Sequence, residues 1–238
     1  MATVGIIGGI GPESTIEYYR LILSLYREQK AGGSNPSILI NSIDIKRMLG
    51  LIGDGELEEA ARYLAGEVER LTCAGAHFAI LAANTPHIVF DEIQDRSPIP
   101  LLSIVEETCK RAASLGLRRV ALFGTAFTMR GGFYERVFER EAIAIVTPRP
   151  DEQNFIHEKY MTELVNGLVL EETKGALLGL AARLKTEENI QGLILGGTEL
   201  SLILRDGDDP AIPFLDTTRI HAESVVRELL KYEREEFS

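Results

Sequence analysis

Two stretches of this chain end an apolar run in small residues and then present a threonine beside a polar side chain. Residues 78–85 finish in Ala83-Asn84-Thr85, and residues 192–199 finish in Gly197-Thr198-Glu199. An apolar run of this kind predicts a buried parallel strand, and the end of such a strand is where α/β proteins bind ligands. The amide and hydroxyl groups can hydrogen-bond a small polar molecule, and a carboxyl group can transfer a proton. We therefore expect one ligand site between two facing halves.

Each of these polar residues also has a structural interpretation. Thr85 and Thr198 could cap helices that follow the strands, a role as common for such threonines as ligand contact. Glu199 either serves as a general acid or base in a closed, partly desolvated cleft or pairs with local groups. His87 and His221 either transfer protons or are hydrogen-bonded structural histidines.

A glycine-rich segment, residues 5–11, leaves an expected strand and leads into a helix that begins at Pro12. Such a turn can present backbone N–H groups to an anion. It is a poor dinucleotide fingerprint, because the third glycine is missing and Glu13 would place negative charge beside a pyrophosphate. We expect no cofactor here, and a carboxylate ligand fits the turn better than a phosphate.

The composition excludes several classes of protein. The chain has 238 residues, of which 45% are hydrophobic and 26% charged, so it can bury a sizeable core. Its formal net charge of −11 would repel nucleic acid. Cys73 and Cys109 both fall within helical patterns, so neither a disulfide framework nor a metal site is expected.

No apolar stretch reaches the roughly 18 residues that a membrane span needs. The N-terminus also lacks the basic, apolar and cleavage regions of a signal peptide. The expected compartment is therefore the cytoplasm, with no membrane partner.

Apolar strands alternate with amphipathic helices along the whole chain. Strands are expected at residues 4–7, 38–43, 78–82, 120–123, 143–146 and 193–195, at residues ending at 103, and near 214. Helices are expected at residues 12–28, 56–74, 104–115, 133–141, 151–166, 171–185 and 217–232. Strands separated by helices pair in parallel through right-handed crossovers. The predicted class is α/β, with helices on both faces of mainly parallel sheets.

Two changes in composition predict hinges between domains, one at residues 96–100 and one at the turn formed by residues 206–213. The expected first α/β domain therefore comprises residues 1–103 plus 214–238, and the second comprises residues 104–213. The last helix would thus return to the first domain.

Five motifs together resemble the aspartate/glutamate racemase family in order and spacing. They are residues 8–19 (GGIGPESTIEYY), 84–87 (NTPH), 124–129 (GTAFTM), 197–199 (GTE) and 214–223 (FLDTTRIHAE). The resemblance implies two pseudo-symmetric α/β domains with the active site in the cleft between them, and usually a homodimer. It also implies an isomerase that acts on aspartate-like or glutamate-like amino acids without pyridoxal phosphate.

The resemblance carries over to individual positions. Inverting an α-carbon needs an acid and a base on opposite faces of the substrate, and typical family members use a cysteine at each strand end. The corresponding residues here are Ala83 and Gly197, which cannot transfer protons. Glu199, and after it His87, are the candidate catalytic groups. The candidate substrate-binding residues are Gly11, Asn84, Thr85, Thr125, Thr128, Thr198 and Arg47, the last at a position where some relatives bind the side-chain carboxylate.

Three functions are compatible with these residues. The first is an amino-acid racemase that works through groups other than thiols. The second is a lyase or decarboxylase on the same scaffold, for which a single proton donor suffices. The third is a non-catalytic protein that binds small dicarboxylates or amino acids.

Overall fold

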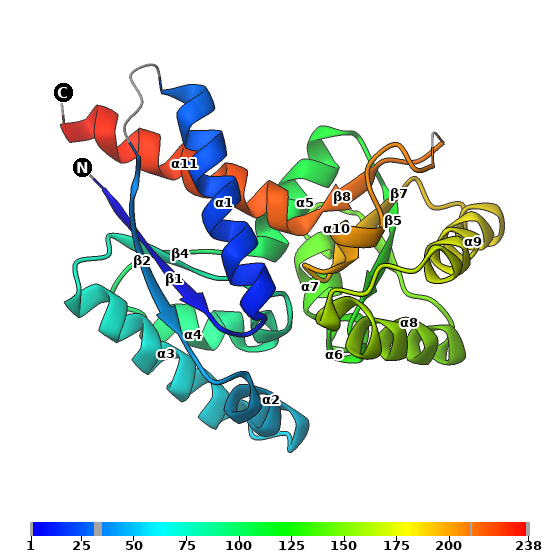
Figure 1. Cartoon of the computed structure of the whole chain (residues 1–238), viewed down its shortest axis with the longest axis horizontal. Helices are drawn as coiled ribbons and strands as arrows, with labels where there is room; N and C mark the ends of the chain where they lie inside the picture. Colours follow the sequence, from blue (N-terminus) through cyan, green and yellow to red (C-terminus); the bar gives the residue numbers. More distant parts are fainter. Residues whose placement is uncertain (1, 31–34, 210, 237–238) are drawn as a thin grey trace. The chain divides into compact units, whose positions relative to one another are not determined.

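The computed structural model describes residues 2–30, 35–209 and 211–236 (Figure 1). The expected domain limits and hinge include Met1, Pro210 and residues 237–238, which lie outside the described residues. The chain divides into two compact units. Unit 1 runs to Ile104 and resumes at His221, and unit 2 comprises Val105–Ile220. No described helix combines the length and apolarity needed to cross a bilayer.

Unit 1 contains a four-stranded parallel sheet. Its strands are β1 (Thr3–Gly8), β2 (Ser37–Ser42), β3 (Phe78–Leu81) and β4 (Leu101–Leu102), in the order β2-β1-β3-β4. The connections contain α1 (Pro12–Gln29), α2 (Ile45–Gly53), α3 (Leu57–Cys73), the 3-10 helix η1 (Thr85–Val89) and α4 (Phe90–Arg96). Every pair of neighbouring strands is parallel, as the alternation of strands and helices predicts.

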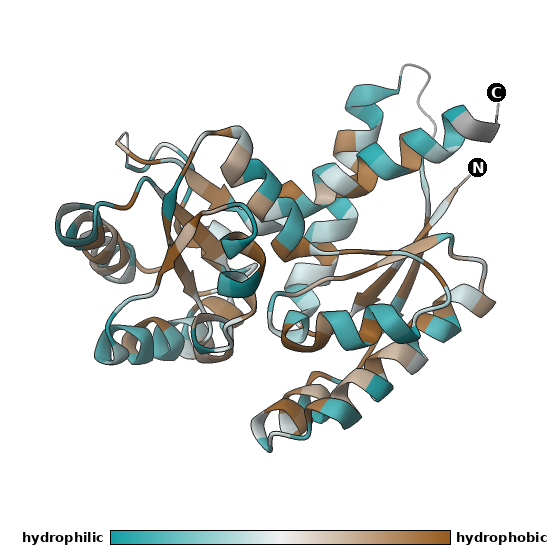
Figure 2. Ribbon diagram, turned by 180° about the vertical axis from the view of Figure 1, so that it is seen from behind, coloured by the Kyte–Doolittle hydropathy of each residue, from teal (hydrophilic) through white to brown (hydrophobic). Residues whose placement is uncertain are grey.

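The hydrophobic core of unit 1 contains residues from the first elements of the chain and from its last helix. On one face of the sheet, alternate residues of β1 and β3 pack against α1 and against the final helix, α11 (Thr217–Glu236). The buried members from α11 are Ala222, Val225, Val226 and Leu229. On the other face, Gly5 allows α3 to approach closely, since a Cβ there would lie 3.0 Å from Leu71. The hydropathy colouring of Figure 2 places the most apolar segments on the strands.

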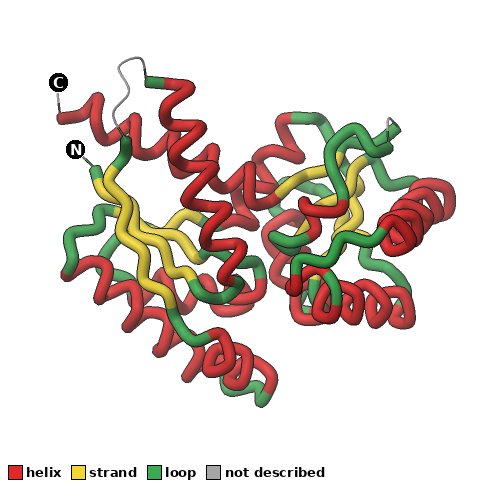
Figure 3. Tube along the Cα trace, viewed as in Figure 1, coloured by secondary structure: helices red, strands yellow, loops and turns green. Residues whose placement is uncertain are grey.

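Unit 2 repeats this plan. Its strands are β5 (Arg119–Gly124), β6 (Ala144–Val146), β7 (Gly192–Gly196) and β8 (Phe214–Asp216), all parallel and in the order β6-β5-β7-β8. Its helices are α5 (Ile104–Ser114), α6 (Ala126–Arg130), α7 (Phe133–Glu139), α8 (Pro150–Thr162), η2 (Leu164–Asn166), α9 (Glu171–Glu188) and α10 (Leu200–Ile203). Figure 3 shows strands flanked by helices in each unit. The two sheets thus share one topology, and the predicted fold class is confirmed.

The structure differs from the sequence expectation at one domain boundary. Residues 214–220 were expected in the first domain, but β8 pairs with β7 and therefore belongs to the sheet of unit 2. The chain passes from unit 2 to unit 1 within α11, between Ile220 and His221. An unbroken helix shows no change of composition at that point, which is why the sequence did not reveal the crossing.

The expected helix at residues 151–166 is divided into α8 and η2, with Glu163 between them. The short helices α2, α4, α6 and α10 were not expected from the sequence. Helices of fewer than about ten residues show little periodicity, so neighbouring parts of the fold decide whether they form.

Candidate functional site

Each sheet has one point at which the strand order reverses. In unit 1 the chain goes from β1 outward to β2 and then returns to the other side of β1 as β3, and in unit 2 the strands β5, β6 and β7 do the same. Open α/β sheets bind ligands outside the carboxyl ends of the two strands that flank such a point. The candidate residues other than Arg47 follow these four strand ends, two in each unit.

In unit 1, the segment after β1 is a turn built around glycine. Gly9 has a φ of +79°, and a Cβ at this position would lie 2.3 Å from the Ile43 carbonyl oxygen. The Gly9 amide donates to Thr15 Oγ1 at 2.9 Å, and the same hydroxyl donates to the Gly11 carbonyl at 3.1 Å. Gly11, a candidate binding residue, is the N-cap of α1. The turn therefore holds the start of this helix at the carboxyl end of β1.

The second strand end of unit 1 carries Ala83, Asn84 and Thr85. Asn84 and Thr85 are buried and Ala83 is half-buried. Asn84 is the N-cap of η1 and Thr85 is its first residue, and the Asn84 side chain makes no capping hydrogen bond to the helix. Thr85 is therefore not the helix cap that one interpretation of the sequence suggested. These residues stand beside the end of β1, because Leu81 pairs with Ile7.

His87 is fully enclosed and both of its ring nitrogens meet backbone groups. Nδ1 lies 3.0 Å from the Ala83 carbonyl oxygen, and Nε2 accepts from the Ile104 amide at 3.2 Å. Since a carbonyl can only accept, Nδ1 carries the proton in this arrangement. Burial, and secondarily the nearby His221, lowers the pKa of His87 to about 3. These contacts favour the structural interpretation of His87, as the neutral ring ties the end of β3 to the start of α5.

His221 is held in a similar way. Its Nδ1 accepts from the Tyr18 hydroxyl at 2.8 Å, and its Nε2 donates to the Leu102 carbonyl at 3.0 Å. The ring thus links α1, β4 and α11 within unit 1. The two histidine rings meet edge to face with centroids 6.4 Å apart.

Arg47 lies in the first turn of α2, which follows the carboxyl end of β2. Its side chain is exposed, and the guanidinium carbon stands 4.2 Å from the centre of the Tyr63 ring. A guanidinium stacked on an aromatic face keeps its donors available at the edges. Arg47 therefore stands on the same edge of the sheet as the glycine turn.

In unit 2, the end of β5 is occupied by two of the candidate threonines. Thr125 is the N-cap of α6, and its hydroxyl accepts from the Thr128 amide at 3.2 Å. The two hydroxyls lie 3.1 Å apart. The role of helix cap thus falls to Thr125 rather than to Thr85 or Thr198. Gly124 pairs with Gly196, which brings this end of β5 beside the end of β7.

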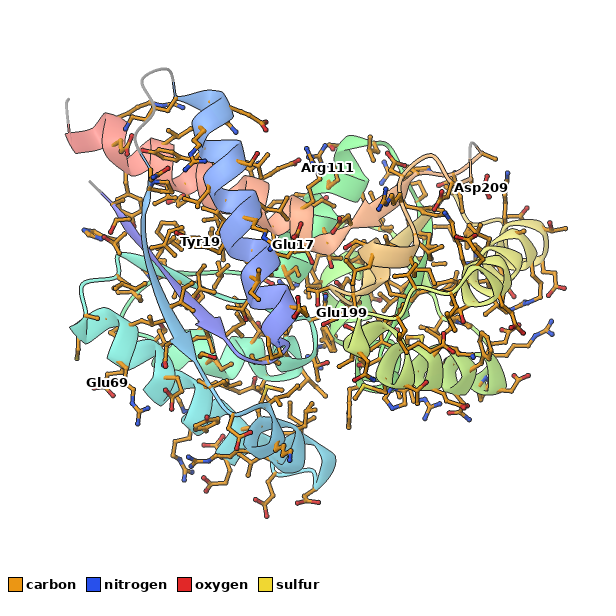
Figure 4. All side chains as sticks on the ribbon, viewed as in Figure 1. Glu17, Tyr19, Glu69, Arg111, Glu199 and Asp209 are labelled. Atoms are coloured by element: carbon orange, nitrogen blue, oxygen red, sulfur yellow. The ribbon has the colours of Figure 1, made fainter. Side chains whose placement is uncertain are left out.

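The end of β7 carries the one candidate acid of the set. Glu199, labelled in Figure 4, is buried and immediately precedes α10. Its Oε2 accepts from the Thr198 hydroxyl at 2.7 Å and also from the hydroxyl of Tyr160 on α8. Burial, followed by the Glu199 charge, raises the pKa of Tyr160 well above its usual value, so the phenol keeps its proton.

Tyr160 also occupies the space next to Gly197. A Cβ at position 197 would lie 2.5 Å from Cε2 of the Tyr160 ring and 3.1 Å from its hydroxyl oxygen. Non-bonded atoms in folded proteins do not approach one another this closely, so any larger residue at 197 would require the ring to move. The space beside Gly197 is thus filled by an aromatic ring from another helix.

Sequence reasoning missed two residues at the ends of β5 and β7, His157 and Tyr160. They are three residues apart on α8 and therefore share one helical face. His157 Nδ1 accepts from the Ala126 amide at 3.3 Å, at the end of β5. Burial, and then the Arg130 charge, lowers the pKa of His157. The spacing of two titratable side chains on one helix was the available signal, but it does not show which strand the helix covers.

The topology and the polar strand ends together define an α/β protein built from two like units, each with polar side chains at the edge where its strand order reverses. Residues 7–225 match the Asp/Glu/hydantoin racemase family. The chain belongs to this family.

Three similar proteins cover nearly the whole chain. The broad specificity amino-acid racemase RacX of Bacillus subtilis (strain 168) is 27% identical over 252 residues, covering 97% of this chain and 99% of the relative. A crystal structure of a candidate Asp/Glu racemase from Yersinia pestis is 32% identical, with a TM-score of 0.89, and covers 97% of this chain and 100% of that one. An aspartate racemase homologue from Pyrococcus horikoshii OT3 is also 32% identical, with a TM-score of 0.83, and covers 98% of this chain and 99% of that one.

Proposed function

We propose that this protein is an amino-acid racemase-type enzyme that moves the α-proton of aspartate-like or glutamate-like substrates without pyridoxal phosphate or a metal. The observation that carries the proposal is the carboxylate of Glu199, held at the end of β7 by two hydroxyl donors, Thr198 and Tyr160. A buried carboxylate fixed in this way is a candidate general base or acid. Membership in a family of racemases supports the reaction class.

The proposed binding residues suit a small zwitterion. Neutral donors and acceptors at the four strand ends would hold the α-carboxylate and the ammonium group. These residues are Gly11, Asn84, Thr85, Thr125, Thr128 and Thr198. Arg47 would bind the second carboxylate, because its fork of donors matches that group. The proposal includes a homodimer as the assembly.

The end of β3 favours a second candidate function. Ala83 offers only a methyl group there, and both nitrogens of His87 are engaged by backbone groups. Racemisation needs a proton-transferring group on each face of the α-carbon. A proton group contributed by unit 2 alone would suffice for a lyase or decarboxylase, or for exchange of the α-proton with retention of configuration.

One experiment separates these candidates. The protein is incubated in D₂O with L- and D-aspartate and L- and D-glutamate, and the α-proton signal, the enantiomer ratio, and release of carbon dioxide or ammonia are followed. A racemase exchanges the α-proton and inverts the centre. Exchange without inversion, or release of either small product, indicates one-sided chemistry. Thermal stabilisation by a ligand with neither exchange nor product release would mark a non-catalytic binder.

The role of Glu199 is tested by Glu199→Gln, which keeps the shape of the side chain and removes its charge. We expect the exchange rate to fall by about 100-fold or more, the range that a general acid or base contributes. Glu163→Gln is the matched control. Glu163 is also a buried glutamate of unit 2, bound by Lys159 and Thr173, and it does not lie at a strand end. Equal losses in both variants would contradict the assignment.

A further inference from the structure

The side chain of Tyr160 contacts two residues at the end of β7, Gly197 and Glu199. Its ring fills the volume that any side chain on residue 197 would need, and its hydroxyl donates to Glu199. Tyr160 itself is 7% exposed and Gly197 is buried. A single aromatic residue on α8 therefore determines what position 197 can hold and how the adjacent carboxylate is oriented.

We infer that Tyr160 is the positioning residue of the proton-transfer step in unit 2: it excludes a side chain from position 197 and holds the Glu199 carboxylate in its place. This inference rests on the proposed function, since it concerns the same reaction. In this inference the proton-transferring group is residue 199, rather than residue 197 as the family resemblance implies.

The step balances without a co-reactant. The α-carbon–hydrogen bond breaks, its electron pair stays on carbon and is delocalised into the substrate carboxylate, and the proton is taken up by Glu199. The reverse transfer returns the proton and restores the Glu199 carboxylate. Tyr160 keeps its own proton throughout and stabilises the ionised carboxylate as a hydrogen-bond donor.

The two donors to this carboxylate come from different parts of the chain. The Thr198 hydroxyl reaches the same oxygen at 2.7 Å, but Thr198 is the neighbouring residue in the same turn. Tyr160 lies 39 positions away on a different helix. A donor carried by a separate rigid element fixes the carboxylate relative to the sheet, which a neighbour in the same turn cannot do.

The hydroxyl contribution is tested by Tyr160→Phe, which keeps the ring and removes only the donor. We expect α-proton exchange in D₂O to fall about 10-fold or more at neutral pH. We also expect the loss to fall on kcat with KM unchanged, because Tyr160 orients the carboxylate and does not bind the substrate. The matched control is Tyr134→Phe. Tyr134 is a fully buried tyrosine of unit 2 whose hydroxyl bonds to Thr108. It should leave both kcat and KM unchanged.

The exclusion of a side chain at 197 is tested separately, by denaturation. Gly197→Ala should lower the melting temperature by several degrees when Tyr160 is present. In a Tyr160→Leu background, which lacks the ring atoms nearest the new methyl group, the same substitution should lower it much less. If the two substitutions lower the melting temperature additively, this part of the inference is overturned. Effects of independent sites add, whereas those of contacting residues do not.

The outcomes distinguish the two proposals. Wild-type protein that exchanges no α-proton with any of the four amino acids overturns the proposed function and the positioning role together. Wild-type exchange with an unchanged kcat in Tyr160→Phe overturns the positioning role alone. A lowered kcat with unchanged KM in Tyr160→Phe, absent from Tyr134→Phe, supports both.

Discussion

At the scale of single residues, the strand ends of the two units differ in the groups that can carry a proton. In unit 2, Glu199 is bound by two hydroxyl groups and stands beside a second titratable side chain, Tyr160. In unit 1, Ala83 cannot transfer a proton and burial keeps His87 neutral. We therefore propose that the proton chemistry is centred on unit 2 and that the strand ends of unit 1 contribute binding groups.

The enclosure of His87 predicts acid sensitivity. Its folded-state pKa of about 3 lies below its ordinary value of 6.5, so between these values the unfolded chain binds the proton and the folded protein does not. The contribution of His87 to stability is therefore present above pH 6.5 and is lost as the pH falls from 6.5 toward 3. Through His87, the free energy of unfolding falls by at most about 1.4 kcal/mol for each pH unit of acidification.

Urea unfolding of His87→Gln between pH 7 and pH 4 tests this slope. The variant lacks the titrating group, so its stability should fall less steeply with acid than that of the wild-type protein. Parallel curves for the variant and the wild-type protein would contradict the prediction.

At the scale of elements, the site depends on how each strand passes into the next helix. Gly9 takes a backbone conformation that favours glycine, and it passes so close to Ile43 that no Cβ fits. Thr15 then ties this turn to α1 through two hydrogen bonds. The motif after β1 is thus explained by backbone geometry, which places the N-terminus of α1 at the carboxyl end of β1.

Gly9→Ala should destabilise the protein by about 3 kcal/mol, from the left-handed backbone cost and the collision with Ile43. Gly75→Ala separates the two contributions. Gly75 has a φ of +99° with no atom within 4 Å of a built Cβ, so only the backbone cost of about 1 kcal/mol applies. Urea denaturation measures both, and similar losses would show that the close approach to Ile43 is not costly.

At the scale of the whole molecule, unit 1 is assembled from both ends of the chain. Helix α11 supplies four buried core residues to unit 1, while β8 just before it completes the sheet of unit 2. The folding of unit 1 therefore depends on a segment that follows unit 2 in the chain.

A chain that ends at residue 220 tests this dependence. It loses the buried side chains of α11, whose removal exposes apolar core worth several kcal/mol, at about 1.5–3 kcal/mol for each large side chain. Hydrogen exchange should then show loss of protection in β1 and β3 and retained protection in β5 and β7. A chain that ends at Arg234 keeps all the buried residues of α11 and should remain protected throughout, whereas protected β1 and β3 in the shorter chain would contradict the prediction.

The amino-acid sequence by itself determined the α/β class, the alternation of strands and helices, and the polar residues at the strand ends. These follow from local periodicity and from turn chemistry, which short stretches of chain contain. The order of the strands, the return of residues 214–216 to the second sheet and the meeting of Tyr160 with Gly197 were decided only by the tertiary structure. Each of these joins residues that are far apart in the sequence, and pairing over such distances is selected by packing rather than by local preference.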